Sequence, residues 1–577
     1  MRIVFVEIRT FRGIRTLDWA PAAAVNCLIG PGDSTKTTIL DAIELALYPR
    51  SYVFADDSDF FDLDVNEPVK ITVTLAGLPS EFKSDDRYGT HLRGWNAQES
   101  KIEDESGEGL EDALSVRVTI DRSLEAHWSI FNRRIGEEES NPPTLRYTDA
   151  KQLATTRLGP YAERHLGWGR QSVLTRIGEA TDNISLQLAE ASRSARETFR
   201  QSNQKVFEKT VARAEQLGKQ FSVPVREKYA AEIDVQNVNI TAGGLSIHDG
   251  KLPLRRLGTG SSRLIVSALQ HDAGRSHIAL IDEIEHGLEP HRIARLLKYL
   301  KSPTTGEGKV PASQIFMTTH SPVVIRELIA GDIFAVRSEA GKTTVRSIAA
   351  TAKDIDTAQG HLRSSPDAFL ARRVLVGEGR TEQGLLRGLD AWWSLKGRDS
   401  FALRGVIPID GGGNPKAPVI AEHLLDLGYG VSLLLDTDKP PPAALVDSVK
   451  KKGGIVCEWP DACSTEERIF LDVPWETVIA LVRFAEEWVG AGVKDTINNI
   501  CQGQGISKIA DLKLPASLDT TDFRRAMGKA AKNKNNHWFK DITSGERLAE
   551  LIAPCLDQIP DRPLAITISA LRQWVDE

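Results

Sequence analysis

Residues 374–386 read VLVGEGRTEQGLL, a short apolar run, a glycine-rich turn and the start of a helical pattern. The apolar run 374–376 is typical of a strand that a parallel sheet buries on both faces. Glu378 then stands at the carboxyl end of that strand. If a helix begins near Arg380, Glu382 lies about one turn into it and faces the same crevice. The stretch therefore predicts a strand, a turn and a helix, with two carboxylates at one edge of a sheet.

A second apolar run, VSLLLDTDKP at residues 431–440, ends in two aspartates. Asp436 and Asp438 follow the predicted strand, and side chains two residues apart on a strand point the same way. Four carboxylates at the carboxyl ends of two parallel strands repel one another unless a divalent cation neutralises them. The two runs therefore predict a Mg²⁺ or Mn²⁺ site, against the alternative of a plain turn and a solvated loop tip.

This pair of motifs resembles the TOPRIM domain of topoisomerases, primases and a group of nucleases, over residues 368–475. In that domain a Glu after the first strand and a DxD after a later strand bind metal. The chain has no cysteine cluster of the kind that primases carry, and residues 476–577 contain no tyrosine for the covalent step of a topoisomerase. The resemblance therefore favours a hydrolytic nuclease.

Composition is that of a globular protein with several domains. The 577 residues are 41% hydrophobic and 26% charged, and no apolar run approaches the ~20 residues that span a bilayer. Residues 1–13 do not resemble a signal peptide, and the five cysteines lack metal-finger spacing. We therefore expect a cytoplasmic protein with reduced thiols and no membrane contact.

Because the net charge is −7, DNA binding must rest on local basic patches or bridging metals. Candidate patches are Arg372 and Arg373, residues 450–452 and residues 524–540.

The N-terminal part of the chain carries a phosphate-loop pattern. A predicted hairpin over residues 1–20 precedes an apolar strand, the loop GPGDSTKTT at 30–38 and an apolar helix. The loop nearly meets the template GxxxxGK[ST], with Lys36 placed for the β and γ phosphates of ATP and Thr37 for Mg²⁺. Thr35 replaces the glycine before the lysine, and a β-branched residue at positive φ costs about 1–2 kcal/mol, which allows a loop of different shape. The ATP contacts predicted here are Gly30, Gly32, Thr35, Lys36, Thr37 and Thr38.

Further motifs follow in the order found in an ABC-type ATPase. Residues 257–261, LGTGS, occupy the place of the signature and can offer backbone amides to a γ-phosphate. In HIALIDEIEHGLEP at 277–290, a strand precedes Asp282, expected to hold Mg²⁺ through water, and Glu283, expected to orient the attacking water. His320 ends another strand, where a switch histidine senses the γ-phosphate. The additional predicted ATP contacts are Gly258, Gly260, Ser261, Asp282, Glu283 and His320.

In this order the motifs resemble the ATPase head of SMC, Rad50 and RecF proteins, over residues 1 to about 345. Residues 287–290, GLEP, resemble the D-loop of such heads. No Q-loop glutamine is evident, and Asp59 and Phe60 occupy that region. In heads of this type the signature of one subunit completes the ATP site of another, so the resemblance implies a homodimer or a higher homo-oligomer.

An ABC-type head followed by a TOPRIM domain is a narrow combination. It resembles the OLD (overcoming lysogenization defect) family of nucleases, which includes the nuclease subunit of the Gabija phage-defence system. The resemblance implies a DNA endonuclease in anti-phage defence, with a UvrD-like helicase as a partner. The family's nuclease residues map onto Glu378, Glu382, Asp436 and Asp438, onto Ser464 and Glu466 with Glu467 or Glu458 as alternatives to Glu466, and onto Lys534 or Lys540.

The chemistry implied is two-metal hydrolysis of a DNA phosphodiester. One ion, held by Glu378 and Asp436 near Asp438, is expected to activate water. The second ion, held by Glu382 and Glu466, is expected to stabilise the leaving oxygen, with the lysine offsetting phosphate charge. ATP is expected to regulate access to the nuclease sites. Two alternatives stay open: an ATP-gated DNA-binding repair protein of RecF or SMC type without cleavage, and a TOPRIM toxin nuclease directed at RNA or tRNA.

We therefore expect an α/β chain of five segments. Residues 1–165 form the N-terminal lobe of the ATPase head with Walker A, and 166–235 a helical insertion or dimerisation region. Residues 236–350 complete the head with the signature, Walker B and the His switch. Residues 351–475 form the TOPRIM domain with its Rossmann-like parallel sheet, and 476–577 a mainly helical C-terminal part.

Overall fold

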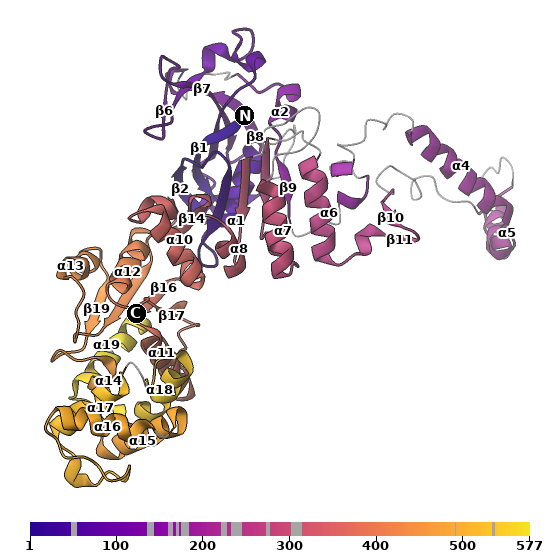
Figure 1. The fold of residues 1–577 in the computed structure, drawn as a ribbon. Coiled ribbons are helices and arrows are strands. Elements are labelled where there is room, and N and C mark those ends of the chain that lie inside the picture. The colour runs from indigo at the N-terminus through magenta and orange to yellow at the C-terminus, as the bar shows by residue number, and fades with distance from the viewer. Residues whose placement is uncertain are drawn as a thin grey trace.

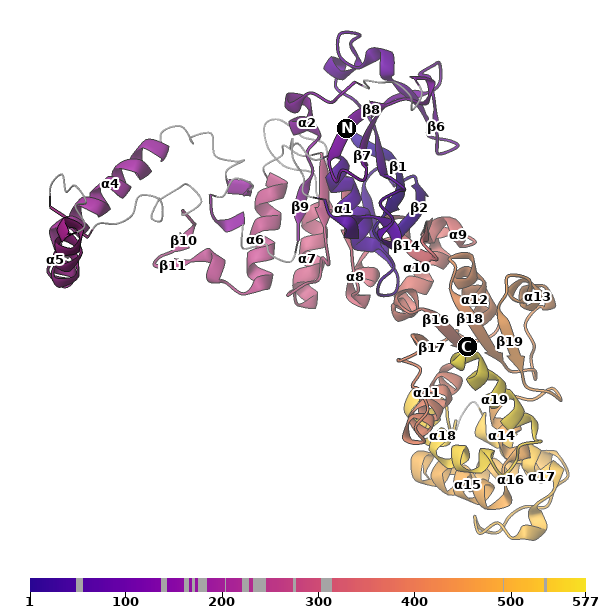
Figure 2. The same cartoon turned by 180° about the vertical axis from the view of Figure 1, so that it is seen from behind.

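The computed structural model describes residues 1–47, 55–135, 143–159, 165–168, 172–174, 184–202, 204–220, 228–231, 245–272, 277–301, 314–490, 492–533 and 537–577. This part of the chain contains a mixed sheet of thirteen strands and a parallel sheet of four strands, and helices pack against both (Figure 1). The mixed sheet belongs to the N-terminal region, and the parallel sheet with its C-terminal helices forms a second body beside it (Figures 1 and 2). The α/β class expected from the sequence is confirmed.

One half of the mixed sheet is antiparallel. β1 (Arg2–Phe11) and β2 (Ile14–Trp19) form the hairpin expected at the N-terminus. β4 (Val69–Ala76) pairs with the other edge of β1, and β7 (Glu111–Ile120) pairs with β4. The remaining strands of this half are β5 (Arg93–Asn96), β6 (Lys101–Glu103) and β8 (Ala126–Phe131).

The other half places three strand ends at one edge. β3 (Val25–Ile29) lies between β13 (Gln314–Thr318) and β14 (Ile333–Glu339) and is parallel to both. β12 (Ile278–Ile281) pairs in parallel with β13. Because parallel strands end at the same edge, the phosphate loop after β3, Asp282 after β12 and His320 after β13 come together. β9 (Thr156–Leu158) and β15 (Lys342–Ser347) complete this half.

Helices cover this sheet, and two of them lie apart from it. The covering helices include α1 (Lys36–Ala46), α2 (Tyr147–Leu153), α6 (Thr259–Asp272), α7 (Pro290–Lys301), α8 (Pro322–Glu327), α9 (Ile348–Thr351) and α10 (Ile355–Ser364).

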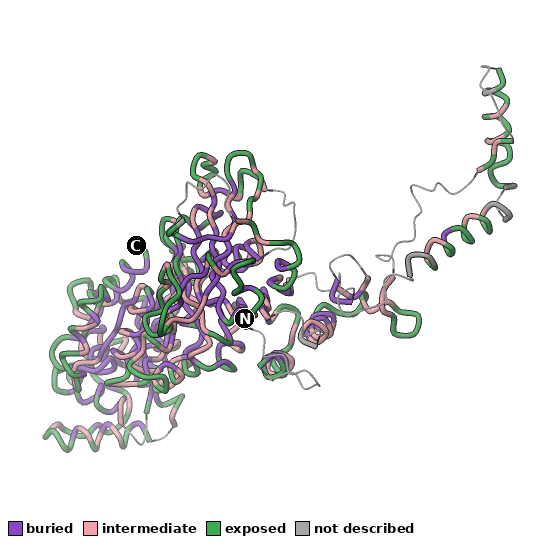
Figure 3. The backbone as a smooth tube through the Cα atoms, turned by 90° about the horizontal axis from the view of Figure 1, so that it is seen from above, coloured by how far each residue is buried: buried purple, intermediate pink, exposed green. Residues whose placement is uncertain are grey.

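The two separate helices are α4 (Ile184–Ser202) and α5 (Gln204–Gln220), which lie away from the main body and are mostly exposed (Figure 3). Both helices lie within residues 166–235, where a helical insertion or dimerisation region was expected. Their role in dimerisation stays a prediction.

The parallel sheet has the strand order β17-β16-β18-β19. Its members are β16 (Arg373–Gly377), β17 (Val406–Asp410), β18 (Gly430–Leu435) and β19 (Ile455–Glu458), joined by α11 (Arg380–Leu395), α12 (Lys416–Asp426) and α13 (Ala443–Lys451). The strand, turn and helix expected over 374–386 are thus confirmed. The chain leaves β16 toward β17 on one side and then crosses to β18 on the other. Such a reversal makes a topological switch point, and ligands of open α/β sheets bind outside the strand ends at that point.

The C-terminal helices pack onto this sheet as part of the same body. They are α14 (Thr465–Asp472), α15 (Trp475–Val489), α16 (Gly492–Gly503), α17 (Thr521–Ala531), α18 (Ile542–Leu556) and α19 (Pro563–Asp576). One buried core joins Leu375 of β16 to Trp538 and Trp574. Residues 351–475 and 476–577, expected as two segments, therefore share a core. Among the described helices, none has the length and apolar character needed to cross a bilayer.

Candidate functional sites

The phosphate loop holds Lys36 in a nearly closed cradle. The Lys36 ammonium donates to the carbonyl oxygens of Gly30 at 3.1 Å and Pro31 at 2.7 Å, and to Ser34 Oγ at 3.1 Å. Burial lowers the pKa of Lys36 to about 8, although the nearby carboxylates oppose this shift. Gly32 has open space around its Cα on the side where a Cβ would point. The loop thus carries a lysine and an accessible backbone where phosphates are expected.

Thr35 keeps a left-handed backbone, with φ 65° and ψ 15°, although it is β-branched. Its hydroxyl donates to the Ser34 carbonyl at 2.6 Å and lies 3.2 Å from Thr343 Oγ1. The Thr35 methyl group lies against Gly13, where an added Cβ would be 3.2 Å away. These contacts offset part of the backbone strain. The positive φ that the glycine of the template would supply is therefore present despite the substitution.

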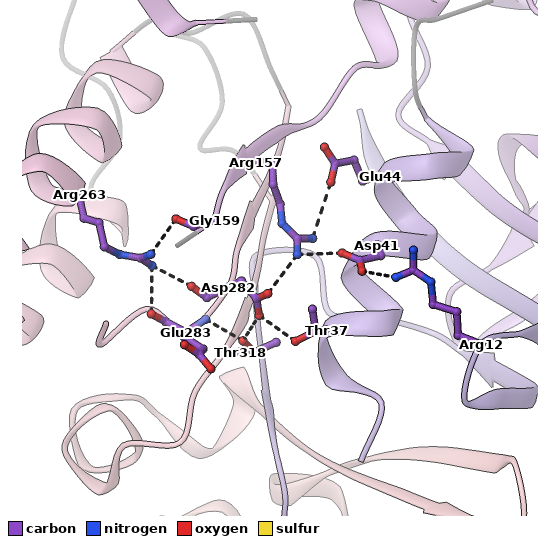
Figure 4. Close-up of polar contacts among 10 residues, drawn as sticks. All are labelled: Arg12, Thr37, Asp41, Glu44, Arg157, Gly159, Arg263, Asp282, Glu283 and Thr318. Atoms are coloured by element: carbon purple, nitrogen blue, oxygen red, sulfur yellow. Dashed lines mark hydrogen bonds and ion pairs between the residues drawn. The ribbon is translucent and has the colours of Figure 1, made fainter. Parts of the chain in front are cut away.

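Asp282 connects the phosphate loop to the neighbouring strands (Figure 4). Its Oδ1 accepts hydrogen bonds from Thr37 Oγ1 at 3.1 Å and from Thr318 Oγ1 at 2.6 Å. Its Oδ2 accepts from Arg157 at 3.2 Å, and the same arginine nitrogen donates to Asp41 at 2.9 Å. The predicted Mg²⁺ residues Thr37 and Asp282 are thus brought into direct contact, with an arginine balancing the carboxylate charge. Thr38 lies beside them, half-buried on α1.

Two other acidic residues lie beside Asp282. Glu283 has a φ of 45°, and its carboxylate is half-exposed and 3.6 Å from His286 Nδ1. Glu285 accepts hydrogen bonds from Thr319 Oγ1 at 2.7 Å and from the His320 backbone N–H at 2.6 Å. Desolvation and the charge of Lys36 lower the pKa of His320, so its neutral form is favoured. The backbone after β13 is therefore tied to the loop after β12.

The signature stretch packs against the D-loop of the same chain. A Cβ on Gly260 would lie only 2.0 Å from the Gly287 carbonyl oxygen, so both loops need glycine to approach this closely. Ser261 Oγ accepts a hydrogen bond from Arg292 at 3.3 Å. Gly258 is exposed at the start of α6, with open space beside it. Gly260 thus has a packing role within the chain, and Gly258 is the more open of the two.

At the switch point of the second sheet, Glu378 and Asp436 are in contact. The Asp436 backbone N–H donates to Glu378 Oε2 at 3.2 Å, which joins the ends of β16 and β18. Asp436 Oδ1 accepts from both the backbone N–H and the hydroxyl of Thr465, each at 2.9 Å. These contacts bring the start of α14 to the same place. The sheet edge and one C-terminal helix therefore meet around two carboxylates.

Two buried glutamates complete this acidic cluster, which consists of Glu378, Glu382, Asp436 and Glu466. The Glu382 side chain caps the start of α11 by accepting from the Gly379 N–H at 2.8 Å. Burial, reinforced by the charge of Glu466, raises the pKa of Glu382 to about 7. Burial and the charges of Glu382, Glu466 and Glu378 raise the pKa of Asp436. Ionisation of all four carboxyl groups in the acidic cluster is therefore energetically unfavourable.

Asp438 lies in the loop after β18 and forms an ion pair with a lysine. β18 ends at Leu435, so both aspartates lie in the following loop rather than on the strand, and their carboxylates have different hydrogen-bond partners. Asp438 accepts from Lys532 Nζ at 2.7 Å, and the same ammonium donates to Glu467 at 2.9 Å. Strand alternation therefore does not apply to either aspartate, but Asp438 still lies near the acidic cluster, because its charge adds to the burial that raises the pKa of Glu378. That Asp436 and Asp438 point the same way stays a prediction.

The other predicted residues around α14 have varied surroundings. Ser464 is the N-cap of α14 and forms a capping box with Glu467. Glu458, at the end of β19, is 3.6 Å from Lys450. Lys540 is exposed, and its charge partly opposes the burial that raises the pKa of Glu378. Lys534 lies outside the described residues. Glu466, rather than Glu458 or Glu467, is thus the glutamate whose charge adds to the burial that raises the pKa values of Glu378, Glu382 and Asp436.

A protein-family comparison bears on the N-terminal region. The family described as "AAA domain, putative AbiEii toxin, Type IV TA system" matches residues 25–326, more than half of the chain. The chain belongs to this family. The matched AAA domain contains Lys36, Asp282 and His320. The match shows that this region of the chain is an ATP-binding domain of the ATPase type. The acidic cluster at residues 378–466 lies outside the match.

Solved structures similar to the chain include heads of SMC proteins. An Smc head bound to the C-terminal winged-helix domain of ScpA shares 13% identity with a TM-score of 0.33, covering 60% of this chain and 97% of that one. The SMC head of Thermotoga maritima shares 14% identity with a TM-score of 0.27, covering 60% and 99%. Scores this low add nothing to the assignment of a function. No curated protein matches the chain.

Several residues of the AAA domain and the acidic site were not predicted from the sequence. Arg157 reaches Asp282 across 125 residues of sequence, and Arg263 donates to the carbonyl oxygens of Asp282 and Glu283 at 2.8 and 3.0 Å (Figure 4). Lys532 binds two acidic residues of the second site. Arg263 could have been found in the sequence, because it is a single arginine within an apolar helical pattern, and such a residue needs polar partners when it is buried. Arg157 belongs to no local motif, and Lys532 lies in the basic segment 524–540, where Lys534 and Lys540 were the lysines expected at the site.

Proposed function

We propose that the chain is a metal-dependent DNA endonuclease whose AAA domain regulates cleavage through ATP, resembling TOPRIM nucleases of the OLD family in anti-phage defence. The observation that carries the proposal is the hydrogen bond between Asp436 and Glu378 at the switch point of the parallel sheet. At such a point the strand ends offer their side chains to a ligand. The buried carboxylates of Glu382 and Glu466 adjoin this pair.

The residues of the acidic cluster fit a hard divalent cation. Oxygen ligands suit Mg²⁺ and Mn²⁺, and a cation would relieve the repulsion that raises the pKa values of Glu382 and Asp436. Among the described residues, no three Asp, Glu, His or Cys side chains lie close enough together to coordinate one metal ion. The carboxylates of the acidic cluster must therefore change rotamer to bind the ion. Glu378, Glu382, Asp436 and Glu466 would hold Mg²⁺ or Mn²⁺, which supplies a Lewis acid for phosphodiester hydrolysis.

Basic side chains beside the acidic cluster support the handling of a phosphate. Lys532 holds Asp438 and Glu467 through ion pairs of 2.7 and 2.9 Å, which fixes the loop after β18 against α14. Lys540 is exposed beside Glu378 and offers a cation to an incoming phosphate. Lys532 therefore has a positioning role in the proposal, and Lys540 a substrate-binding role.

The position of the phosphate loop supports regulation by ATP. A cavity of about 1010 Å³ has Pro31 and Gly32 of that loop among its lining residues, together with residues of α11, β17 and α18. A conformational change of the phosphate loop on ATP binding could therefore displace α11, the helix that contains Glu382. Closure of a homodimer by the signature stretch of the partner around ATP remains part of this proposal.

The experiment is nicking of supercoiled plasmid by the full chain with Mg²⁺ or Mn²⁺. Asp436→Ala and Glu382→Gln are expected to lower the nicking rate by about 100-fold or more, because each removes a cation ligand. The matched control is Glu458→Gln, a carboxylate at the end of the neighbouring strand that pairs with Lys450 outside the acidic cluster. It is expected to nick at the wild-type rate.

Two results would favour other functions. Tight binding of plasmid without any nicks, in wild type and variants alike, would favour an ATP-gated DNA-binding protein of the RecF or SMC type. Cleavage of tRNA with intact plasmid would favour a toxin-like nuclease directed at RNA.

A further inference from the structure

A lysine ammonium lies between two carboxylates at the edge of the proposed nuclease site. Lys532 Nζ donates to Asp438 Oδ2 at 2.7 Å and to Glu467 Oε2 at 2.9 Å. The Lys532 side chain is 25% exposed, and those of Asp438 and Glu467 are 23% and 9% exposed. The three charges are therefore largely withdrawn from water, which strengthens their attraction and orders the ammonium.

The close packing of two helices brings the ammonium to this place. α17 packs against α14 at Gly528, where an added Cβ would lie 2.5 Å from the Glu467 Cα (Figure 1). Lys532 follows Gly528 by four residues, and its backbone N–H donates to the Gly528 carbonyl oxygen at 3.3 Å. It therefore lies one helical turn beyond the contact, on the same face of α17. The position of the lysine is thus set by the backbone of the helix pair.

Asp438 connects this ion pair to the acidic cluster. Burial raises the pKa of Glu378, and the charge of Asp438 adds to this rise. Glu467 is the sequence neighbour of Glu466, whose charge likewise adds to the burial that raises the pKa of Glu382. Carboxylates shift one another's pKa in this way only when they lie close together. The ammonium therefore adjoins the place proposed for the divalent cation.

A second divalent ion could use Asp438 and Glu467, but both are engaged by the ammonium. Glu467 Oε2 also accepts from the Ser464 backbone N–H at 3.0 Å and so completes the capping box of α14. An ion bound there would break this cap and would lie beside a positive charge. The Lys532 ammonium therefore opposes a second ion and supplies positive charge in its place.

We propose that the Lys532 ammonium takes the place of a second metal ion, so that the nuclease site of each chain binds one divalent cation. The charges of the other three members of the acidic cluster add to the burial that raises the pKa of Asp436, so these four carboxylates fit one shared ion. The inference differs from the two ions that the family resemblance implies. It rests on the proposed function, because it concerns the same site.

The test counts the Mn²⁺ ions bound to the full chain without nucleotide, followed by electron paramagnetic resonance. The parent protein carries Asp282→Asn, which removes the predicted Mg²⁺ ligand of the AAA domain. One ion per chain is expected for this parent, and two ions are expected when Lys532→Met is added. Methionine removes the ammonium but keeps an unbranched side chain, and it leaves the carboxylates of Asp438 and Glu467 to a metal. Further addition of Asp438→Asn is expected to restore the count of one.

Two control variants are expected to keep the count at one ion. Lys532→Arg retains a positive charge between the two carboxylates. Lys529→Met makes the same charge change as Lys532→Met at an exposed position of α17, about one turn earlier. A general effect of lost positive charge on Mn²⁺ binding would appear in Lys529→Met as well.

Two outcomes would overturn the inference and leave the proposed nuclease standing. They are two bound ions in the parent protein, and a single ion in a Lys532→Met protein that thermal unfolding shows to be folded. The count in the parent needs no change at Lys532, so the inference can fail even where Lys532→Met does not fold. No bound ion in the parent, together with intact plasmid in the nicking experiment, would contradict the proposed function itself and the inference with it.

Discussion

At the residue scale, Lys36 has a pKa of about 8 because the phosphate loop buries its ammonium. Bound ATP would stabilise the protonated ammonium of Lys36, whereas in the protein without ATP this group loses its proton above about pH 8. The affinity for ATP is therefore expected to fall as the pH rises through 8, by up to about tenfold per pH unit. An ordinary lysine would show this fall only above about pH 10. Calorimetric titration of ATP between about pH 7 and pH 9 measures the effect.

Lys36→Arg is the control for this prediction, because arginine keeps its charge across that range. Its affinity is expected to be flat between about pH 7 and pH 9. An equally flat wild-type profile would show that the environment of Lys36 does not shift its proton equilibrium.

Sequence reasoning found the residues whose signals are local. Lys36, Asp282 and Glu378 each follow an apolar strand within a short motif, so their place at a strand end could be predicted. Lys532 could not be, because its partner Asp438 is 94 residues away and only tertiary packing brings them together. The direction of Asp438 could not be predicted either, because β18 ends before the two aspartates and alternation no longer applies to them.

At the element scale, α11 and α18 approach each other through glycines. A Cβ on Gly388 of α11 would lie 2.5 Å from the Ala549 Cβ, and one on Gly384 would lie 2.3 Å from the Ile542 carbonyl oxygen. Gly388→Val is therefore expected to destabilise the chain by about 1–3 kcal/mol, since overpacking forces the helices apart. Thermal unfolding measures this loss. Nicking is expected to fall as well, because α11 carries Glu382.

Gly360 provides the matched control, since it lies within α10 and a Cβ there would meet nothing within 4 Å. Gly360→Ala is expected to leave stability unchanged or raise it by up to about 1 kcal/mol. Equal unfolding temperatures for Gly388→Val and wild type would contradict the close packing of α11 and α18. The sequence predicted a helix that begins near Arg380 after a glycine turn, but it carried no signal for the contact between this helix and α18.

At the scale of the whole molecule, the proposed coupling between ATP and cleavage would act through the cavity that residues of the phosphate loop and of α11 line. Glu283→Gln is expected to slow ATP hydrolysis while keeping ATP bound, because Glu283 adjoins Asp282 and is expected to orient water. Plasmid nicking by this variant is then expected to differ from wild type when ATP is present and to match it without ATP. Identical nicking in both conditions, with the oligomer intact, would remove the coupling.

The central claim is that the acidic cluster holds a divalent cation. Its most direct test is Mn²⁺ binding, followed by electron paramagnetic resonance, to the full chain without nucleotide. Wild type is expected to bind Mn²⁺ more tightly at about pH 8 than at about pH 6, because Glu382, with a pKa of about 7, and Asp436 must lose their protons. Asp436→Asn is expected to lose this binding, while Asp282→Asn in the AAA domain keeps it. Absence of Mn²⁺ binding by wild type, or equal binding by Asp436→Asn, would contradict the account.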